Sequence, residues 1–355
     1  MRYLIILYLV SCVILSGDSL RSMALQKGLA PVPSDFETLI SQVDDKENPI
    51  SVEKVQLGKK LFFDKNLSLD RSIACAKCHN ATHGGADGKA TAIGYKNQEN
   101  PKHLNSPTVF NTAYSKHFFW DGRAKSLREQ ASGPMQAHFE MASPLSLVVE
   151  RVKENKEYEE YFLKAYGSKE SINIDTITKA IAVYEKTLVT RGAFDVYLEG
   201  DDNAISASAK QGLELFIHLG CKACHFGPAV GGQRIQKFPL RDYNSIIGIT
   251  STYYNETKKR AVTDVNLNFE VHHPFPFENI GGFMGLDGTK KFRVPILRNI
   301  SKTAPYFHNG AVKTLREAIS IMAINQIGVK LTPTQLDNIE DFLKSLDGKL
   351  VDFGF

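Results

Sequence analysis

The sequence predicts a mainly α-helical protein with two related domains and long irregular loops. Apolar residues recur at helical spacing along most of the chain, whereas alternating strand patterns are scarce. The pentapeptide Cys-x-x-Cys-His occurs twice, and the residues around its two copies are alike. With 355 residues and a 43% hydrophobic content, the chain is long enough for two globular domains.

The expected elements follow from this periodicity and from residues that start and end helices. Leu213, Phe216 and Ile217 share one helical face, and Gly220 can end that helix. Thr332 is an expected N-cap for the last helix. The other amphipathic helices are expected at 147–166, 174–189, 312–323 and 333–346. The segment 243–291, rich in Gly, Asn, Thr and Pro, is expected to be an irregular connection.

The two pentapeptides are Cys75-Ala76-Lys77-Cys78-His79 and Cys221-Lys222-Ala223-Cys224-His225. Cys-x-x-Cys-His is the attachment signature of c-type haem, in which both thiols bond the porphyrin and the imidazole binds the iron. A shared zinc ribbon requires Cys pairs about 15–20 residues apart, and a thioredoxin-like site requires a βαβ context. Neither condition is met, so we expect two cytochrome c-like haem domains and two covalently bound haem c groups. Separate metal sites or disulfides remain the alternatives.

An internal duplication is indicated by matching residues on both sides of the motifs. Gly58-Lys-Lys-Leu-Phe62 precedes the first motif and Gly212-Leu-Glu-Leu-Phe216 the second, and a Gly pair follows each motif. The repeat is far longer than the 20–50 residues of solenoid repeats. We therefore expect an N-terminal domain at 25–200 and a C-terminal domain at 201–355, with the boundary in the polar stretch 200–204.

The N-terminus reads as a secretory signal peptide, expected at 1–24. Arg2 is followed by an apolar run to Leu15, which is too short to span a bilayer, and then by small residues. Leu9-Val-Ser-Cys12 also fits a lipoprotein cleavage box, and only lipidation of Cys12 would attach the chain to a membrane. Export agrees with c-type haem, and we expect a periplasmic location. The net charge of +4 gives no reason to expect nucleic acid as a partner, and a homodimer stays open.

Each iron has a sixth coordination position that these motifs do not fill. A Met or His there makes an electron-transfer centre, and an open position makes a site for small oxidants. Spacing does not choose among the candidates, which are His83, His103, His117, His138, His218, His272, His273, His308, Met135, Met141, Met284 and Met322.

Several blocks closely resemble the bacterial di-haem cytochrome c peroxidases over nearly all of the chain after the leader. These blocks are Leu57-Gly-Lys-Lys-Leu-Phe-Phe-Asp64, Asn105-Ser-Pro-Thr-Val-Phe-Asn111, Phe119-Trp-Asp-Gly-Arg-Ala124, Glu129-Gln130, Glu140-Met141 and Thr303-Ala-Pro-Tyr-Phe-His308. The resemblance implies reduction of hydrogen peroxide to water, with electrons from a small redox protein such as a mono-haem cytochrome c. A di-haem electron carrier without peroxidase activity and a di-haem oxidase of another substrate are the alternatives.

The resemblance also implies roles for individual residues. The first motif would hold the peroxidatic haem, and the second an electron-receiving haem with Met322 as sixth ligand. Gln130 and Glu140 match catalytic residues of the distal pocket, and Trp120 matches an aromatic residue between the haems. The three residues expected to bind one calcium ion between the domains are Asn105, Thr303 and Pro305.

The sequence departs from the family at Ile93-Gly94-Tyr95. Many members have a His in place of Tyr95, which blocks the peroxidatic iron until the other haem is reduced. The loop that follows Tyr95 is longer here and contains His103. Three hypotheses remain: His103 takes the blocking role, Tyr95 binds or caps the iron, or the iron stays open.

Overall fold

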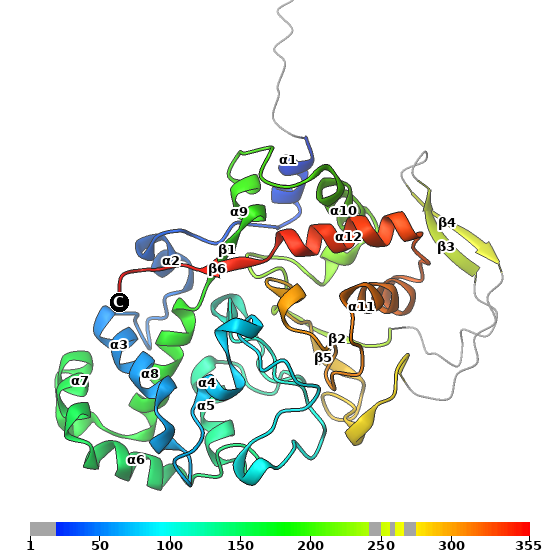
Figure 1. Ribbon diagram of the computed structural model, residues 1–355. Helices are drawn as coiled ribbons and strands as arrows, with labels where there is room; N and C mark the ends of the chain where they lie inside the picture. The colour runs from blue at the N-terminus through cyan, green and yellow to red at the C-terminus, as the bar shows by residue number, and fades with distance from the viewer. Residues whose placement is uncertain (1–18, 241–249, 256–259, 266–274) are drawn as a thin grey trace, which may run out of the picture.

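The computed structural model describes residues 19–240, 250–255, 260–265 and 275–355, and for 250–265 only the backbone. Helices dominate this part of the chain, and its strands form three separate antiparallel pairs, β1–β6, β2–β5 and β3–β4 (Figure 1). The expected mainly α class is therefore confirmed.

In the first half of the chain, α4 contains the cysteines of the first motif, and longer helices lie on both sides of it in the sequence. The bounds are α1 (Ser19–Gln26), α2 (Phe36–Val43), α3 (Val52–Phe63), α4 (Cys75–Cys78), α5 (Leu127–Gln136), α6 (Leu145–Glu154), α7 (Lys156–Tyr166), α8 (Ile174–Thr187) and β1 (Thr190–Gly192).

In the second half of the described chain, α9 and α10 come before β2 to β5, and α11 and α12 come before β6. The bounds are α9 (Ala193–Leu198), α10 (Ala207–His218), β2 (Ile235–Lys237), β3 (Thr250–Asn255), β4 (Arg260–Val265), β5 (Lys291–Arg293), α11 (Leu315–Met322), α12 (Pro333–Ser345) and β6 (Gly348–Leu350).

The helix ends agree with local sequence signals. The Thr332 hydroxyl accepts a hydrogen bond from the Gln335 backbone N–H, and the Gln335 side-chain oxygen accepts one from the Thr332 backbone N–H, which completes a capping box. Gly220 follows α10 with φ +93°, a conformation that glycine adopts without strain. The N-cap expected at Thr332 and the helix end expected at Gly220 are both confirmed.

The matching glycines of the repeat have the same structural role. A Cβ on Gly58 of α3 would lie 2.0 Å from the carbonyl oxygen of Ala180 in α8. A Cβ on Gly212 of α10 would lie 1.9 Å from the carbonyl oxygen of Asn338 in α12. In both halves, the helix before the motif crosses a later helix at a glycine. The sequence similarity therefore corresponds to a repeated packing contact.

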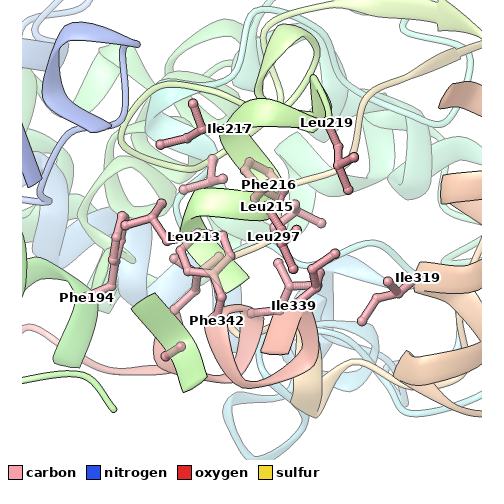
Figure 2. Packing of buried hydrophobic residues seen from close by; sticks show 14 of the residues in the cluster. Phe194, Leu213, Leu215, Phe216, Ile217, Leu219, Leu297, Ile319, Ile339 and Phe342 are labelled. Carbon is pink, nitrogen blue, oxygen red and sulfur yellow. The ribbon is translucent and has the colours of Figure 1, made fainter. Parts of the chain in front are cut away.

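Two large hydrophobic clusters form the core. The first joins α3, α6, α7 and α8 and includes Leu61 and Phe162. The second joins α9, α10 and α12, where Phe194, Phe216 and Phe342 pack together (Figure 2). Along the chain, the last buried residue of the first cluster is Leu188, and from Phe194 onward the second cluster takes up the buried apolar residues. The chain therefore passes from the first cluster to the second at β1.

Each end of the described chain packs on the opposite half. Ala24 of α1 is buried in the second cluster, and Arg21 pairs with Asp202 beyond α9. Phe353 and Phe355 contact the ring of Phe36 in α2, which adjoins the first cluster. Figure 1 shows the C-terminus beside α2 and α3. These exchanges tie the halves together through apolar burial.

Two expectations about elements were wrong in part. The helix expected over 147–166 is broken at Asn155, which ends α6 and then caps α7 through its side chain. The connection expected to be irregular contains the hairpin β3–β4. Its strands are rich in β-branched residues and Tyr, which favour β-structure. The Gly and Pro content of the whole segment led instead to the prediction of an irregular connection.

Candidate haem sites

The first motif opens on a cavity of about 260 Å³. Cys75, Cys78 and His79 line it on one side, and Trp120, Gln130 and Glu140 also lie in its wall. The sequence separates these two groups by about 50 residues. The structure therefore brings the first attachment motif and all three expected catalytic residues to one cavity.

His225 is buried and His79 is half-buried, and both lie against backbone that a Gly pair brings close. His79 Nδ1 lies 3.2 Å from the carbonyl oxygen of Gly85, which fixes the ring and leaves Nε2 as the other nitrogen. A Cβ on Gly231 would lie 2.1 Å from the Pro295 oxygen and 3.4 Å from His225 Nδ1. Burial lowers the pKa of His79 and lowers the pKa of His225 to about 4. Both imidazoles are therefore neutral at pH 7, the form that binds a metal.

The repeat extends to the rings beside these histidines. The ring centroid of Phe62 lies 6.4 Å from that of His79, and the centroid of Phe216 lies 6.4 Å from that of His225. Each Phe is the last residue of the repeated Gly-x-x-Leu-Phe segment. The two motifs are thus placed by equivalent apolar contacts.

The four motif cysteines form no disulfide within the described chain, and Cys75 and Cys221 pack against the apolar clusters. Burial raises the pKa of Cys75 to about 12 and the pKa of Cys78 to about 11, and it raises the pKa of Cys221 to about 12. Reactive redox cysteines have the opposite property, a lowered pKa and an exposed thiolate. The site therefore does not fit a thioredoxin-like centre, in agreement with the sequence interpretation.

Glu140 follows the end of α5 and is half-buried in the wall of the first cavity. Burial raises the pKa of this carboxyl to about 6, although Arg123 nearby acts in the opposite direction. A carboxyl with such a pKa can exchange a proton near neutral pH. Gln130 lies on α5, which Ser126 caps, and shares the same cavity wall.

The segment that departs from the family positions Glu140 through its backbone. The amide of Tyr95 donates a hydrogen bond to the carbonyl oxygen of Glu140 at 2.7 Å. A Cβ on Gly94 would lie 2.1 Å from the Phe139 oxygen, so only glycine permits this approach. The Tyr95 ring packs against the first hydrophobic cluster, and Tyr95 is not among the residues that line the cavity.

His103 also lies outside the set that lines the first cavity, although its neighbours Lys102 and Leu104 belong to it. Its Nδ1 is 3.7 Å from the carboxylate of Glu99, and its backbone has φ +50°. Of the other expected ligand candidates, Met141 lines the first cavity and His308 the second. His272 and His273 lie outside the described residues.

The second motif opens on a larger cavity, of about 570 Å³. Cys221, Cys224 and His225 line it, and Met322 at the end of α11 lines it as well. The chain continues from α11 into a π-helix, Ala323–Ile327, a form that is common at functional sites. Met322 therefore shares a cavity with the second motif, as its expected role requires.

The two cavities share a wall, because six residues line both of them. These residues are Asn105, Ser106, Pro107, Thr108, Trp120 and Arg293. Trp120 Nε1 donates a hydrogen bond to the Asn105 carbonyl oxygen at 2.7 Å, which fixes the indole in this wall. The resemblance implies that Trp120 lies between the two haems, and in the structure Trp120 lines both motif cavities.

The three expected calcium ligands also come together. Asn105, Thr303 and Pro305 all line the second cavity. The side-chain amide of Asn105 donates hydrogen bonds to the carbonyl oxygens of Lys89, at 2.6 Å, and of Pro305, at 3.5 Å. Neutral carbonyl and amide oxygens are suitable ligands for Ca²⁺.

The comparisons with known proteins point to one family. The family model for di-haem cytochrome c peroxidase matches residues 52–203. A cytochrome c551 peroxidase of Pseudomonas aeruginosa is 40% identical over 90% of this chain and 84% of its own length. The methylamine utilization protein MauG of Methylorubrum extorquens is 43% identical over 83% of this chain and 76% of its own. A solved MauG-like protein associated with microbial copper homeostasis has a TM-score of 0.69 at 23% identity, over 91% of this chain and 94% of its own.

Two Cys-x-x-Cys-His motifs, each in its own apolar cavity with a neutral buried imidazole, fit covalently attached haem and define a c-type haem protein. Similarity to the named peroxidase over most of both chains makes the identification specific. The chain belongs to the di-haem cytochrome c peroxidase family. The expected family and the expected enzyme class, cytochrome c peroxidase, are confirmed, and the family implies haem c as cofactor.

Sequence reasoning missed two charged groups at the cavities. Arg293 is buried in the shared wall. Glu185 of α8 lines the first cavity, burial raises its pKa to about 8, and its Oε2 has no hydrogen-bond partner among the described residues. Neither residue lies in a recognisable motif. A single charged residue in an amphipathic segment is normally read as part of a solvent-exposed face, so sequence reasoning did not single them out.

Proposed function

We propose that this protein reduces hydrogen peroxide to water in the periplasm, using two electrons from a small donor such as a mono-haem cytochrome c. The wall shared by the two motif cavities is the observation that carries the proposal. Two redox groups on either side of one wall suit a reaction in which electrons enter at one group and leave at the other.

The first motif belongs to the peroxidatic haem in this proposal. A haem bound there supplies the iron that binds peroxide and the electrons that cleave its O–O bond. Glu140 moves a proton from the inner to the outer peroxide oxygen, which is general acid–base work suited to a carboxyl with a pKa of about 6. Gln130, in the same wall, orients the peroxide by hydrogen bonding.

The second motif belongs to the electron-receiving haem in this proposal, and His225 and Met322 would bind its iron. Both side chains line the second cavity. Thioether ligation raises a haem reduction potential, which suits a centre that accepts electrons from a soluble donor. Trp120, in the shared wall, lies on the route from this haem to the first.

For the sixth position of the first haem, we favour the open site over ligation by Tyr95 or His103. The Tyr95 ring packs into the hydrophobic cluster, and neither side chain lines the first cavity. An open iron needs no reductive activation. Electron paramagnetic resonance of the fully oxidised protein tests this, because a low-spin bis-His signal from the first haem contradicts an open site.

Asn105, Thr303 and Pro305 would hold one calcium ion at the wall shared by the two motif cavities. Their convergence at the second cavity supports this proposal. Calcium titration of chelator-treated protein, followed by the haem spectra, tests it. Unchanged spectra and no calcium uptake contradict it.

The two haem domains of the proposal follow the two hydrophobic clusters. The leader expected at 1–24 overlaps α1, and this proposal shortens it to end before Ser19, because Ala24 of α1 is buried in the second cluster. Cys12 lies outside the described residues, so its lipidation stays a prediction, as does a homodimer. Within the described part of the chain, no helix combines the length and the apolar character needed to cross a membrane.

Steady-state peroxide consumption with a reduced small cytochrome as donor tests the function. Rapid turnover supports the peroxidase. Fast reduction and reoxidation of both haems without peroxide consumption supports the alternative of a pure electron carrier. Turnover only with a protein or small-molecule reductant as substrate supports the alternative of an oxidase.

A further inference from the structure

The wall between the two cavities contains a buried cation without a counter-charge. Arg293 is 3% exposed and, of the six residues that line both cavities, it alone is charged. It makes no ion pair with any described carboxylate, and its Nε has no hydrogen-bond partner in the described chain. Burial lowers its pKa to about 10, and the guanidinium still remains charged at pH 7.

Arg298, five residues further along the chain, is a buried guanidinium that does have a carboxylate partner. Arg298 is 0% exposed and forms two hydrogen bonds to Asp195, at 2.6 and 2.7 Å. An uncompensated buried charge is strongly destabilising, whereas a paired one is tolerated. Arg293 therefore requires an anion that the described polypeptide does not provide.

The other polar groups of the shared wall already have partners. Trp120 Nε1 donates to Asn105, Ser106 Oγ donates to Asp87, and Thr108 Oγ1 donates to Gly84. The Asn105 amide donates to Lys89. The side-chain N–H groups of Arg293 are thus the unused donors of this wall.

The backbone fixes Arg293 in this position. Its amide donates to the Trp120 carbonyl oxygen at 2.8 Å, and β5 pairs with β2 on its other side. The side chain is therefore held in the wall by the same residue that separates the cavities. A fixed guanidinium binds planar carboxylates well, through paired hydrogen bonds.

We infer that Arg293 is the common counter-ion for the propionate carboxylates of both haems. The inference rests on the proposed occupancy of the two cavities, since each haem carries two propionates. One cation facing both groups stabilises the reduced, more negative state of each. Arg293 therefore raises both reduction potentials and couples them electrostatically, a positioning role that needs no contact with peroxide.

Potentiometric titration of the haem-loaded protein tests this inference, after haem content has been measured. Arg293→Gln should lower the midpoint potentials of both haems and shift their resonance Raman propionate bands. Lys291→Gln, an exposed charge on the same strand, is the matched control and should leave both unchanged. If Arg293→Gln does not fold, Arg293→Lys replaces it as the test. It keeps the positive charge, so both midpoint potentials should stay close to those of the unmodified protein.

The outcomes separate this inference from the proposed function. Two haems per chain, with potentials that change no more in Arg293→Gln than in Lys291→Gln, would overturn it. A change at one haem alone would overturn the shared role. Altered peroxide affinity with both potentials unchanged would overturn it as well. Fewer than two haems in the unmodified protein would contradict the proposed cofactor content instead.

Discussion

Trp120 donates its indole N–H to the carbonyl oxygen of Asn105 at 2.7 Å, within the wall that both motif cavities share. One residue of this pair is the proposed route for electrons, and the other is an expected calcium ligand. A cation bound near Asn105 would therefore act on the segment that holds the indole. The hydrogen bond would link the proposed electron route to the proposed calcium site through a single peptide group.

Trp120→Phe is expected to slow electron transfer between the haems several-fold, because it removes the indole and leaves the Asn105 oxygen unpaired. An unsatisfied buried carbonyl costs about 1–3 kcal/mol of stability. Stopped-flow absorbance should show normal reduction of the second haem by the donor and delayed oxidation of it after peroxide addition. Equal delays in both steps would mean that the change had disturbed donor docking and not the wall.

Glu140→Gln is expected to lower kcat/KM by roughly tenfold or more, the scale of general acid–base catalysis, with both haems retained. In the unmodified protein, burial raises the Glu140 pKa to about 6. Because the ionised carboxylate must first accept the peroxide proton, kcat/KM should fall as the pH drops through about 6. The glutamine variant should lose this dependence. A variant that keeps the wild-type pH profile would assign the titration to another group.

Gly94→Ala is expected to reduce peroxide turnover without direct contact with the substrate. The new Cβ would clash with the Phe139 oxygen and break the Tyr95–Glu140 backbone hydrogen bond. Tyr95→Phe is the matched control, since it keeps this backbone and removes only a hydroxyl. It should retain turnover, and a large loss in Tyr95→Phe would revive the hypothesis that Tyr95 acts at the iron.

Motif chemistry made the attachment sites predictable, because Cys-x-x-Cys-His is a local signal. The shared wall was not predictable from residues alone, since it joins Trp120 to Arg293 across about 170 residues of sequence. The resemblance supplied Trp120 and Glu140. It did not supply Arg293, whose significance depends on burial and on the absence of a paired carboxylate within the described structure. Such properties belong to packing and have no local sequence pattern.

Met322→Ala is expected to open the second haem and to lower its midpoint potential, because the thioether ligand is lost. The methionine-to-iron charge-transfer band should disappear from the oxidised spectrum. Met284→Ala is the control, as Met284 lies outside the residues that line the second cavity. Retention of the band in Met322→Ala, or its loss in Met284→Ala, would move the axial ligand to another residue.

Gly58→Ala tests the repeated helix crossing, and the expected effect is on stability. The added Cβ would lie 2.0 Å from the Ala180 oxygen and 2.7 Å from the Tyr184 Cβ, so α3 and α8 must separate. Overpacking of this kind costs about 1–3 kcal/mol, although alanine favours the helix itself. Gln56→Ala, at an exposed position of the same helix, has the propensity gain without the clash. Chemical denaturation of the haem-loaded variants should therefore show a lower midpoint of unfolding for Gly58→Ala alone. Because Phe62 of the same helix contacts His79, the spectrum of the first haem should change at a lower denaturant concentration than that of the second. Equal midpoints for the two variants would mean that the crossing tolerates a side chain and that the shared glycine has no packing role.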